Sequence, residues 1–543
     1  MPSSKFGALL AILAYARAGA TERAWNLFEE AGLGDAGDDP AVLSLKGRLL
    51  KDRALRCGGE AQRRLHYLEA ARAYEQAGEL SRASYPLINA ATLSLLAGAP
   101  DRARGLAAEA ADLVDRQPDE PETPYYRAAT RAEALLLLDR HDEARSAFAE
   151  AVSLAPQAWE DHASTLRQFA LILSALGADA SWLDAHRPPR SLHFGGHMSF
   201  DPKVVRREHL DEKIAAALEE ENVGFGYGAL AAGADIIIAE ALLERGAELH
   251  AVLPGGPEAF AALSVDPFGK AWRKRFDALL ERAETVRPVR PLGARPDSAM
   301  IGLADEVAMG AALMNGRRLE SSAVQLLVLD CAHEANGTSG RSREIWAAGG
   351  WRQRILTAPR ETRPGPAGPE SGEPMPLAAL AVGFAAEAEL AGALAALRDS
   401  IDLLAQPVVP PYLTEDRLIL AFSGPGEAAE AAVRLLGSAS ESLPLRIGGH
   451  YGRAEAFRDP FSGTLRLAPA ATAAATGALA SAPTGTACVT DDFAAALAAA
   501  GPRRPAAEYI GELDPPDSGP PVGLYALKSY DQLFQPLGSD HGQ

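Results

Sequence analysis

The chain has 543 residues, a formal net charge of −19 and an isoelectric point near 5.1. This acidic balance excludes nonspecific attraction to nucleic acid or to an anionic membrane, because that attraction requires an excess of Lys and Arg. The three cysteines are far apart and none lies in a Cys-x-x-Cys pattern, so we expect reduced thiols and a cytoplasmic protein.

Near the N-terminus, an apolar run from Gly7 imitates a secretory signal peptide. Arg17 interrupts this run, and the pattern continues into a second helix. We therefore interpret it as a helix of the folded protein. The sequence contains no stretch of about 20 apolar residues, so no transmembrane span is expected.

Residues 3 to about 180 repeat one pattern of an apolar helix, a turn with Gly or Asp and a second helix. Ala24, Ala103 and Ala144 occupy the same point in three of these units, where a small side chain lets paired helices approach closely. The period is roughly 40 residues, longer than the roughly 34 of a tetratricopeptide repeat. Region 1–187 resembles a tetratricopeptide-type α-solenoid, which implies a groove for a protein partner. A helical spacer without a partner is the alternative.

Pro188 and Pro189 end the helical pattern, and strands then alternate with helices from residue 191 to 358. The unbroken apolar run that begins at Ala323 predicts a buried strand, and residues 271–289 are predicted as one helix. This alternation predicts a doubly wound, Rossmann-like parallel sheet over residues 188–358. In such sheets, ligands bind beyond the carboxyl ends of the strands.

The stretch Val223 to Pro254 is predicted as a glycine-rich turn, an amphipathic helix and a short apolar strand. Gly224, Gly226, Gly228 and Gly233 would let the backbone adopt positive φ and approach a ligand closely. The unpaired N–H groups and the positive partial charge of the following helix would then favour an anion. We therefore expect a phosphate or nucleotide cradle, although the spacing departs from the dinucleotide fingerprint G-x-G-x-x-G.

Three pieces of this region together resemble one family: FGGH at 194–197, GYGALAAGAD at 226–235, and LLVLD at 326–330 followed by NGTSGRSREIWAAGG. They resemble the SLOG superfamily, Rossmann-like domains that sense or process nucleotides and nucleotide-derived signals. The resemblance is to the bacterial variety with tetratricopeptide-like repeats before it and a class III cyclase-like domain after it. The resemblance implies that a nucleotide pocket is lined by Gly195, Gly196, His197, Gly226, Tyr227, Gly228, Gly233, Asp235, Gly337 and Thr338.

One motif of that superfamily is not met. Pro254, Gly255 and Gly256 are followed by Pro257 and Glu258, where the lonely-guy phosphoribohydrolases need Gly-Thr. We interpret this Pro-Gly-Gly as a turn that ends a strand.

Several polar side chains of this region have two interpretations. Asp235 could orient a ribose hydroxyl or an amine, or it could cap its helix. Glu240 could be the nucleophile or general base of a glycosidic cleavage, or a structural carboxylate. His193 and His197 have the spacing of a helical metal pair, but a strand and a turn separate them, so no metal site is predicted. The basic run 270–275 could bind phosphate or form a solvated face.

Residues 359–376 are rich in Pro, Gly and charge and are predicted to be a linker.

Beyond this linker, strands and helices alternate to about residue 530, followed by a tail at 531–543. Four pieces resemble the class III nucleotide cyclase fold: AVGF at 381–384, EDRLILAF at 415–422, RIGGHYG at 446–452 and PTGTACVTDDFA at 483–494. The resemblance implies an α+β, ferredoxin-like domain over 377–530 that can form a homodimer.

The resemblance also implies what catalysis requires: two aspartates that hold metal ions, and an Asn-Arg pair that contacts the ribose and the transition-state charge. Leu380 falls at the first aspartate position, and Asp416, at the second, is the only remnant of the metal site. Ala473 and Gly477 fall at the Asn and Arg positions. We therefore predict a cyclase-like domain without a metal and without catalytic activity.

Together these patterns predict a multidomain cytoplasmic signalling protein of bacterial type that binds a nucleotide or a nucleotide-derived signal. No cofactor other than this ligand is expected. An active adenylate or guanylate cyclase is one alternative, and an enzyme that cleaves the N-glycosidic bond of a nucleotide is another.

Overall fold

The computed structural model describes residues 2–17, 21–35, 37–57, 59–116, 123–199, 207–290, 292–330, 338–359, 375–384, 390–402, 407–414, 417–438, 444–502, 504–513 and 521–528. The chain divides into two compact units, one that holds the residues up to Pro188 and one that holds most residues from Pro189 to Leu533. Within the described ranges, no helix combines the length and the apolar character that a membrane span requires.

The first unit is built from consecutive helices. They are α1 (Pro2–Arg17), α2 (Thr21–Glu30), α3 (Pro40–Arg56), α4 (Glu60–Ser81), α5 (Ser84–Leu96), α6 (Pro100–Arg116), α7 (Pro124–Leu137), α8 (His141–Leu154) and α9 (Trp159–Leu176), with the short 3₁₀ helices η1 (Leu33–Asp35) and η2 (Ser181–His186). Local sequence sets several helix ends. The Asp39 carboxylate accepts a hydrogen bond from the Ala41 N–H at 3.0 Å at the start of α3, and Gly177 ends α9 with a φ of 65°.

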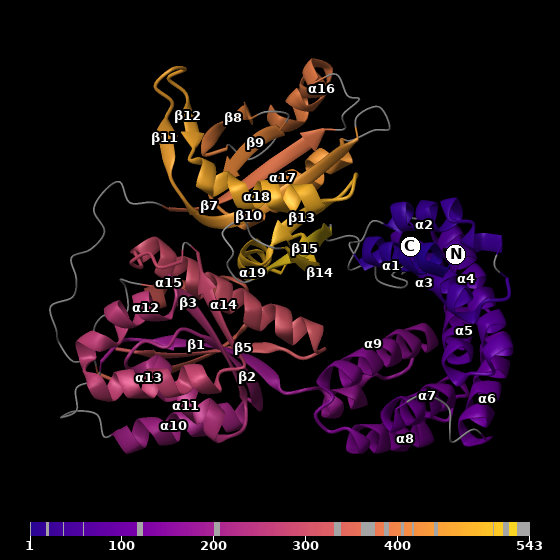
Figure 1. Ribbon diagram of the computed structural model, residues 1–543. Helices are drawn as coiled ribbons and strands as arrows, with labels where there is room; N and C mark the ends of the chain where they lie inside the picture. The colour runs from indigo at the N-terminus through magenta and orange to yellow at the C-terminus, as the bar shows by residue number, and fades with distance from the viewer. Residues whose placement is uncertain are drawn as a thin grey trace, which may run out of the picture. The chain divides into compact units, whose positions relative to one another are not determined.

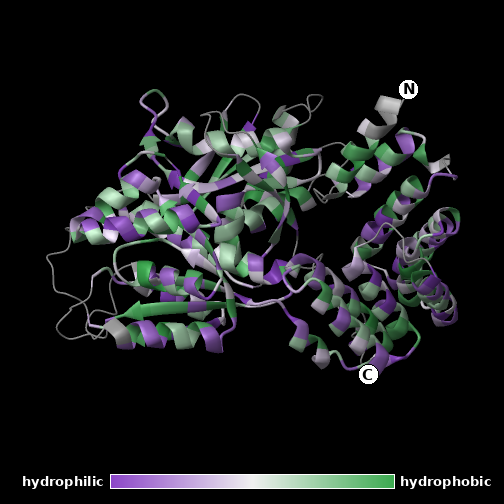
Figure 2. Ribbon diagram, turned by 60° about the horizontal axis from the view of Figure 1, so that its bottom comes forward, coloured by the Kyte–Doolittle hydropathy of each residue, from purple (hydrophilic) through white to green (hydrophobic). Residues whose placement is uncertain are grey.

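The helices of this unit form an inner and an outer layer. Helix α5 contacts both α7 and α9, whereas α6 and α8 lie on the outer side (Figure 1). Hydrophobic and hydrophilic residues alternate along these helices (Figure 2). Ala24, Ala103 and Ala144 are all buried, as the repeated pattern predicts.

The second unit begins with a six-stranded parallel sheet in the order β4-β3-β2-β1-β5-β6. Its strands are β1 (Arg190–Gly196), β2 (Val223–Gly228), β3 (Glu248–Pro254), β4 (Thr285–Val289), β5 (Ala323–Leu329) and β6 (Arg352–Thr357). Its helices are α10 (Arg207–Glu220), α11 (Ala234–Glu244), α12 (Pro257–Ser264), α13 (Lys270–Arg282), α14 (Ser298–Arg318) and α15 (Thr338–Ala348), with η3 (Asp266–Phe268). We call residues 190–357 the six-stranded lobe. All residues of β5 are buried, which confirms the buried strand predicted from its apolar run.

Two local predictions for this lobe are wrong. The glycines predicted to form turns at 195–196 and 224–228 belong to β1 and β2, for a reason that the packing below explains. The single helix predicted over 271–289 ends at Arg282, and Thr285–Val289 forms β4. Pro288 would break a helix interior, but β4 is the edge strand of its sheet, where a proline is tolerated.

The two faces of the six-stranded sheet differ in polarity. Leu192 and Phe194 of β1 lie in the hydrophobic core with residues of α10, α11 and α13. His193 and Gln325 alternate with these residues and point to the opposite face, where α14 and α15 lie; they hydrogen-bond to each other, and the Gln325 amide also donates to the Ser342 hydroxyl. Figure 1 shows α10, α11 and α13 along one side of the sheet and α14 and α15 along the other.

The chain continues into a seven-stranded mixed sheet in the order β14-β15-β13-β10-β7-β9-β8, with a small separate hairpin, β11-β12. Its strands are β7 (Met375–Phe384), β8 (Val409–Thr414), β9 (Arg417–Phe422), β10 (Leu445–Ala454), β11 (Ala456–Arg458), β12 (Leu465–Leu467), β13 (Ala487–Thr490), β14 (Ala506–Leu513) and β15 (Val522–Lys528). Its helices are α16 (Leu390–Asp402), α17 (Pro425–Gly437), α18 (Pro469–Ser481) and α19 (Asp491–Ala499). We call residues 375–528 the seven-stranded lobe.

Helix α18 covers one face of this second sheet, and α17 and α19 cover the other. Two neighbouring glycines of β10 show the close packing. A Cβ on Gly448 would lie 2.1 Å from the Ala475 carbonyl oxygen of α18, and a Cβ on Gly449 would lie 2.8 Å from Val489. Only glycine fits at these positions without a shift of the backbone or of α18.

The two lobes belong to one compact unit, and polar contacts join them. The Arg287 guanidinium of β4 lies 3.2 Å from the Asp491 carboxylate at the start of α19. The Tyr451 hydroxyl of β10 donates to Glu306 of α14 at 3.0 Å, and Arg453 donates to Asp297 at 2.9 Å.

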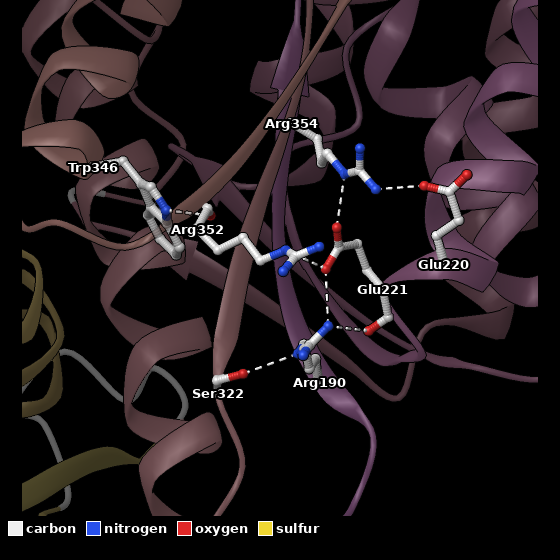
Figure 3. A network of polar contacts seen from close by, with 7 residues as sticks. All are labelled: Arg190, Glu220, Glu221, Ser322, Trp346, Arg352 and Arg354. Carbon is white, nitrogen blue, oxygen red and sulfur yellow. Dashed lines mark hydrogen bonds and ion pairs between the residues drawn. The ribbon is translucent and has the colours of Figure 1, made fainter.

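A cluster of arginines around Glu221 joins three segments of the six-stranded lobe (Figure 3). The Glu221 carboxylate is nearly inaccessible to solvent and lies 2.7 Å from Nε of both Arg352 and Arg354 and 2.9 Å from Arg190 Nη1. Burial opposes its ionisation, but hydrogen bonds from Arg354 and Arg352 outweigh burial and lower the Glu221 pKa. The carboxylate thus ties the end of α10 to β1 and β6.

We predict that Glu221→Ala lowers the free energy of unfolding of this lobe by about 3 kcal/mol, because three arginines lose their shared counter-charge. The neighbouring variant Glu220→Ala, which removes an exposed partner of Arg354, should cost less than about 1 kcal/mol. Because the Glu221 pKa is lowered by folding, its contribution is present above its ordinary value and is lost as the pH falls. Thermal unfolding of both variants at neutral and acidic pH measures this, and equal losses for the two would contradict it.

Candidate functional site

The candidate site lies at the carboxyl edge of the six-stranded sheet, next to β1. Helix α10, which follows β1 in the chain, and helix α15, which follows β5, lie on opposite faces of the sheet (Figure 1), and β2 and β5 adjoin β1 on its two sides. Strand order reverses at this point, which is where ligands bind in open α/β sheets. Gly337 lies outside the described residues, and Thr338 begins α15 but its side chain is not among those described.

The structure brings the segment after β1 against the segment before α11. The Ser199 N–H donates to the Ala232 carbonyl at 3.1 Å, and Met198 forms a β-bridge with Gly233. A Cβ on Gly233 would lie 2.8 Å from the His197 carbonyl oxygen, and its φ is 136°. Glycine is therefore required here by the chain's own backbone.

The other predicted pocket glycines that the structure describes lie in strands β1 and β2, and most of them make room for protein atoms. A Cβ on Gly196 would lie 2.5 Å from the Val328 carbonyl oxygen, one on Gly226 would lie 2.3 Å from Leu242, and one on Gly228 would lie 2.6 Å from the Phe194 carbonyl oxygen. Gly195 has no such close neighbour. The prediction that 224, 226 and 228 adopt positive φ is wrong: Gly224 makes room for Pro189, Gly226 for α11 and Gly228 for β1.

Asp235 occupies the first turn of α11, where an anion was expected. Its carboxylate accepts a hydrogen bond from the Ala231 N–H at 3.1 Å, and the Gly196 N–H also donates to it. Burial raises the Asp235 pKa to about 8, and the nearby Asp305 carboxylate adds to this rise. The helix N-terminus thus already has its own acidic group, whose hydrogen bonds join α11 to the end of β1 and to the segment before the helix, and these contacts favour a structural role of Asp235.

Asp305 is a site residue that the sequence analysis missed. It lies on α14, its side chain is 23% exposed, and its Oδ1 is 3.1 Å from Nε2 of His193. His193 is fully buried, stacks on Trp346 and lies 3.0 Å from the Gln325 amide. An acidic pair, Asp305-Glu306, within an otherwise apolar helical stretch is the signal that could have indicated this position.

His197 and Tyr227 are held by protein contacts. His197 has Nδ1 at 2.9 Å from the Ser199 carbonyl oxygen and Nε2 at 2.8 Å from the Ala358 carbonyl oxygen. Tyr227 stacks on His250 with ring centroids 4.5 Å apart. The described residues contain no group of three or more metal-ligating side chains.

Glu240 lies on α11 away from this edge. Its two carboxylate oxygens accept hydrogen bonds from Arg275 of α13 at 2.6 and 2.5 Å. Arg273 pairs with Asp277 and Glu258. Arg273 and Arg275 of the basic run are thus paired with carboxylates. These contacts favour a structural role for Glu240 over a catalytic one, and a solvated helix face over a phosphate site for the basic run.

Pro254, Gly255 and Gly256 form a turn after β3, as predicted. The φ values of Gly255 and Gly256 are 74° and 98°, and the Gly255 N–H donates to the Val289 carbonyl at 3.0 Å. The two glycines supply the left-handed backbone that this turn requires.

In the seven-stranded lobe, the positions compared with cyclase catalytic residues have apolar surroundings. Leu380 of β7 is fully buried, and its side chain lies on the face that α17 and α19 cover. Ala473 and Gly477 lie on α18, where a Cβ on Gly477 would lie 3.1 Å from Leu513. Asp416 lies outside the described residues.

Each comparison with known proteins covers only part of the chain. A family model described as Tetratricopeptide Repeats-Sensor matches residues 2–94. No curated protein shows a significant match.

Solved structures of cyclase domains match with low scores. One is an adenylate cyclase from Trypanosoma brucei, with 14% identity, coverage of 28% of this chain and 87% of that one, and a TM-score of 0.24. A second is the guanylyl cyclase domain of a fusion protein from Blastocladiella emersonii, with 12% identity, coverage of 28% and 95%, and a TM-score of 0.24. A third is the guanylate cyclase domain from Catenaria anguillulae in complex with GTP, with 10% identity, coverage of 29% and 97%, and a TM-score of 0.24.

The raised pKa of Asp235 predicts a pH-dependent effect of its replacement. Because folding raises this pKa from 3.8 to about 8, its stabilising contribution is full below about pH 4 and is lost as the pH rises toward 8. We predict that Asp235→Asn, which stays neutral, gains thermal stability relative to the native protein between about pH 5 and about pH 8. Asp277→Asn on exposed α13 is the control and should show no such trend. A constant loss at every pH in Asp235→Asn would contradict the prediction.

Proposed function

We propose that the chain is a cytoplasmic signalling protein that binds a nucleotide or a nucleotide-derived signal at the carboxyl edge of the six-stranded sheet. The repeat region would bind a protein partner, and the seven-stranded lobe would serve regulation or assembly without catalysis. The observation behind this proposal is the strand-order reversal between β1 and β5, with the partly exposed Asp305 beside it.

The charges at this edge favour the nucleoside part of such a ligand next to Asp305. Asp235 and Asp305 are close enough for the Asp305 charge to raise the Asp235 pKa. A phosphate at this point would meet the Asp305 carboxylate and would be repelled. A ribose hydroxyl or an exocyclic amine can donate a hydrogen bond to Asp305, so we assign the contact to one of these groups.

The second support is the chemistry of the seven-stranded lobe. The order of its strands and helices and its sequence pieces resemble class III cyclases, but Leu380 is buried against apolar neighbours. A leucine cannot ligate a metal ion, and an aspartate introduced there would be desolvated. Alanine at 473 and glycine at 477 cannot neutralise phosphate charge. A lobe with this composition can bind and pack, so we assign it a regulatory or assembly role.

The proposed role of the repeat region rests on its helical stacking and on the match to the repeat-sensor family model over residues 2–94. Stacked helical repeats expose an extended inner surface, which suits a partner segment.

Calorimetric titration of the full chain with a panel of nucleotides and cyclic nucleotides tests the ligand site. We expect at least one member to bind, and Asp305→Ala to weaken that binding by at least about tenfold, because a hydrogen bond to a charged group is lost. Glu281→Ala on α13 is the control for a distant acidic residue and should bind as the native chain does. Absence of binding by every member to a folded sample, or equal affinity in Asp305→Ala, would contradict the proposal.

A further inference from the structure

Helix α14 contacts both the candidate site and the seven-stranded lobe. Its residue Asp305 is the partly exposed carboxylate of the site. The next residue, Glu306, accepts a hydrogen bond from the Tyr451 hydroxyl of β10 at 3.0 Å. One turn further along, a Cβ on Gly310 would lie 1.7 Å from the Ala495 carbonyl oxygen of α19. A change at Asp305 and Glu306 therefore reaches the seven-stranded lobe through direct contacts.

Glu306 has partners on two other elements. Its side chain is 10% exposed, its Oε1 accepts a hydrogen bond from Arg341 of α15 at 2.5 Å, and its Oε2 accepts the one from Tyr451. Burial raises the Glu306 pKa and the Asp305 charge adds to this rise, whereas the Arg341 charge and the Tyr451 hydrogen bond oppose it. The ionised form of this buried carboxylate therefore depends on Arg341 as its counter-charge.

Arg341 is the exposed member of these contacts. Its side chain is 61% exposed, and it lies near the start of α15, the helix that follows β5. Because β5 adjoins β1, the start of α15 lies at the carboxyl edge next to the candidate site. Arg295, another exposed cation at this edge, follows β4, which two strands separate from β1. Arg341 is therefore better placed than Arg295 to meet a ligand at Asp305.

The phosphate of a nucleotide at this edge needs a cation, because the Asp305 carboxylate repels it. A guanidinium forms two parallel hydrogen bonds with a phosphate, and a terminal phosphate carries more negative charge than one carboxylate. If Arg341 turns to the phosphate, Glu306 loses its counter-charge and takes up a proton. The hydrogen bond from Tyr451 then has a neutral acceptor and is weaker.

We propose that Arg341 binds the phosphate of the nucleotide and leaves Glu306, which weakens the contact between Glu306 and Tyr451 and so transmits binding to the seven-stranded lobe. This inference rests on the proposed nucleotide site and names how that site regulates the second lobe. Coupling between two sites is reciprocal. Loss of the Tyr451 contact must therefore strengthen phosphate binding.

Calorimetric titration of the full chain with ADP, GDP, CDP and UDP, with the matching nucleosides and with sodium pyrophosphate tests the role of Arg341. Arg341→Ala should weaken binding of the nucleoside diphosphates and of pyrophosphate by at least about tenfold, because a charge-assisted contact is lost. Nucleoside binding should not change. Arg282→Ala, at the end of α13, is the control for a distant arginine and should bind all probes as the native chain does.

Tyr451→Phe tests the coupling to the seven-stranded lobe. It keeps the ring and removes the hydroxyl, and it should strengthen binding of the nucleoside diphosphates by about fivefold without an effect on nucleosides. Tyr509→Phe removes the hydroxyl of a tyrosine of β14 that is 52% exposed, and it should leave every affinity unchanged. A purely structural role of Tyr451 would not produce a gain that depends on phosphate.

Proton uptake gives a third test. The charged and titratable groups that act on Glu306 are Arg341, Tyr451 and Asp305. Departure of the Arg341 charge raises the Glu306 pKa further, so the complex binds a proton where the pH lies between the free and the bound value. Calorimetry at about pH 7.5, above the phosphate pKa of about 6, in buffers of different ionisation enthalpy measures this uptake. Glu306→Gln should abolish it.

Unchanged diphosphate affinity in Arg341→Ala, no gain in Tyr451→Phe, or equal proton uptake in Glu306→Gln would each overturn the proposal and leave nucleotide binding in place. Pyrophosphate binding that depends on Arg341, without any nucleoside binding, would support the role of Arg341 and refute the contact assigned to Asp305. If a folded sample binds neither pyrophosphate nor any diphosphate, this inference and the proposed nucleotide site are both refuted.

Discussion

Burial of helix α19 is the constraint on which the second unit depends most. Every residue from Asp492 to Ala499 is buried, because one side of the helix packs on the seven-stranded sheet and another on α14. A Cβ on Gly310 of α14 would lie 1.7 Å from the Ala495 carbonyl oxygen, so α14 needs a glycine where it meets the backbone of α19. Arg287 places its charge beside Asp491 and Asp492 at the start of the helix. A larger residue at 310 or 495 would therefore disturb both lobes at once.

The sequence was most informative where a pattern is local. The apolar run of β5, the turn at Gly255 and the repeated small residues of the first unit were predicted correctly from neighbouring residues. The predictions for β4 and for the glycines of β2 failed because their causes are long-range. Glycine is required at 226 because Leu242 of α11 packs against it, and residues 285–289 form a strand because they pair with β3. Asp305 was missed for the same reason, since only folding brings α14 beside His193 and Asp235.

At both places where a ligand or a metal ion is expected by resemblance, namely the start of α11 and the Leu380 position, the chain's own side chain occupies the position. At the start of α11, the expected anion position holds the chain's own Asp235, and in the seven-stranded lobe Leu380 fills a core position. Groups that would perform chemistry are thus replaced by groups that pack or cap. We propose that ligand recognition depends instead on the partly exposed Asp305 beside β1.

We propose that the chain binds nucleotides without converting them. Incubation of the 543-residue protein with ATP or GTP and Mn²⁺, followed by chromatographic measurement of cyclic products, tests this proposal. We predict no cyclic nucleotide above a protein-free control, because a leucine at position 380 cannot hold the metal ion. Cyclic AMP or cyclic GMP that accumulates in proportion to protein concentration would refute the proposal.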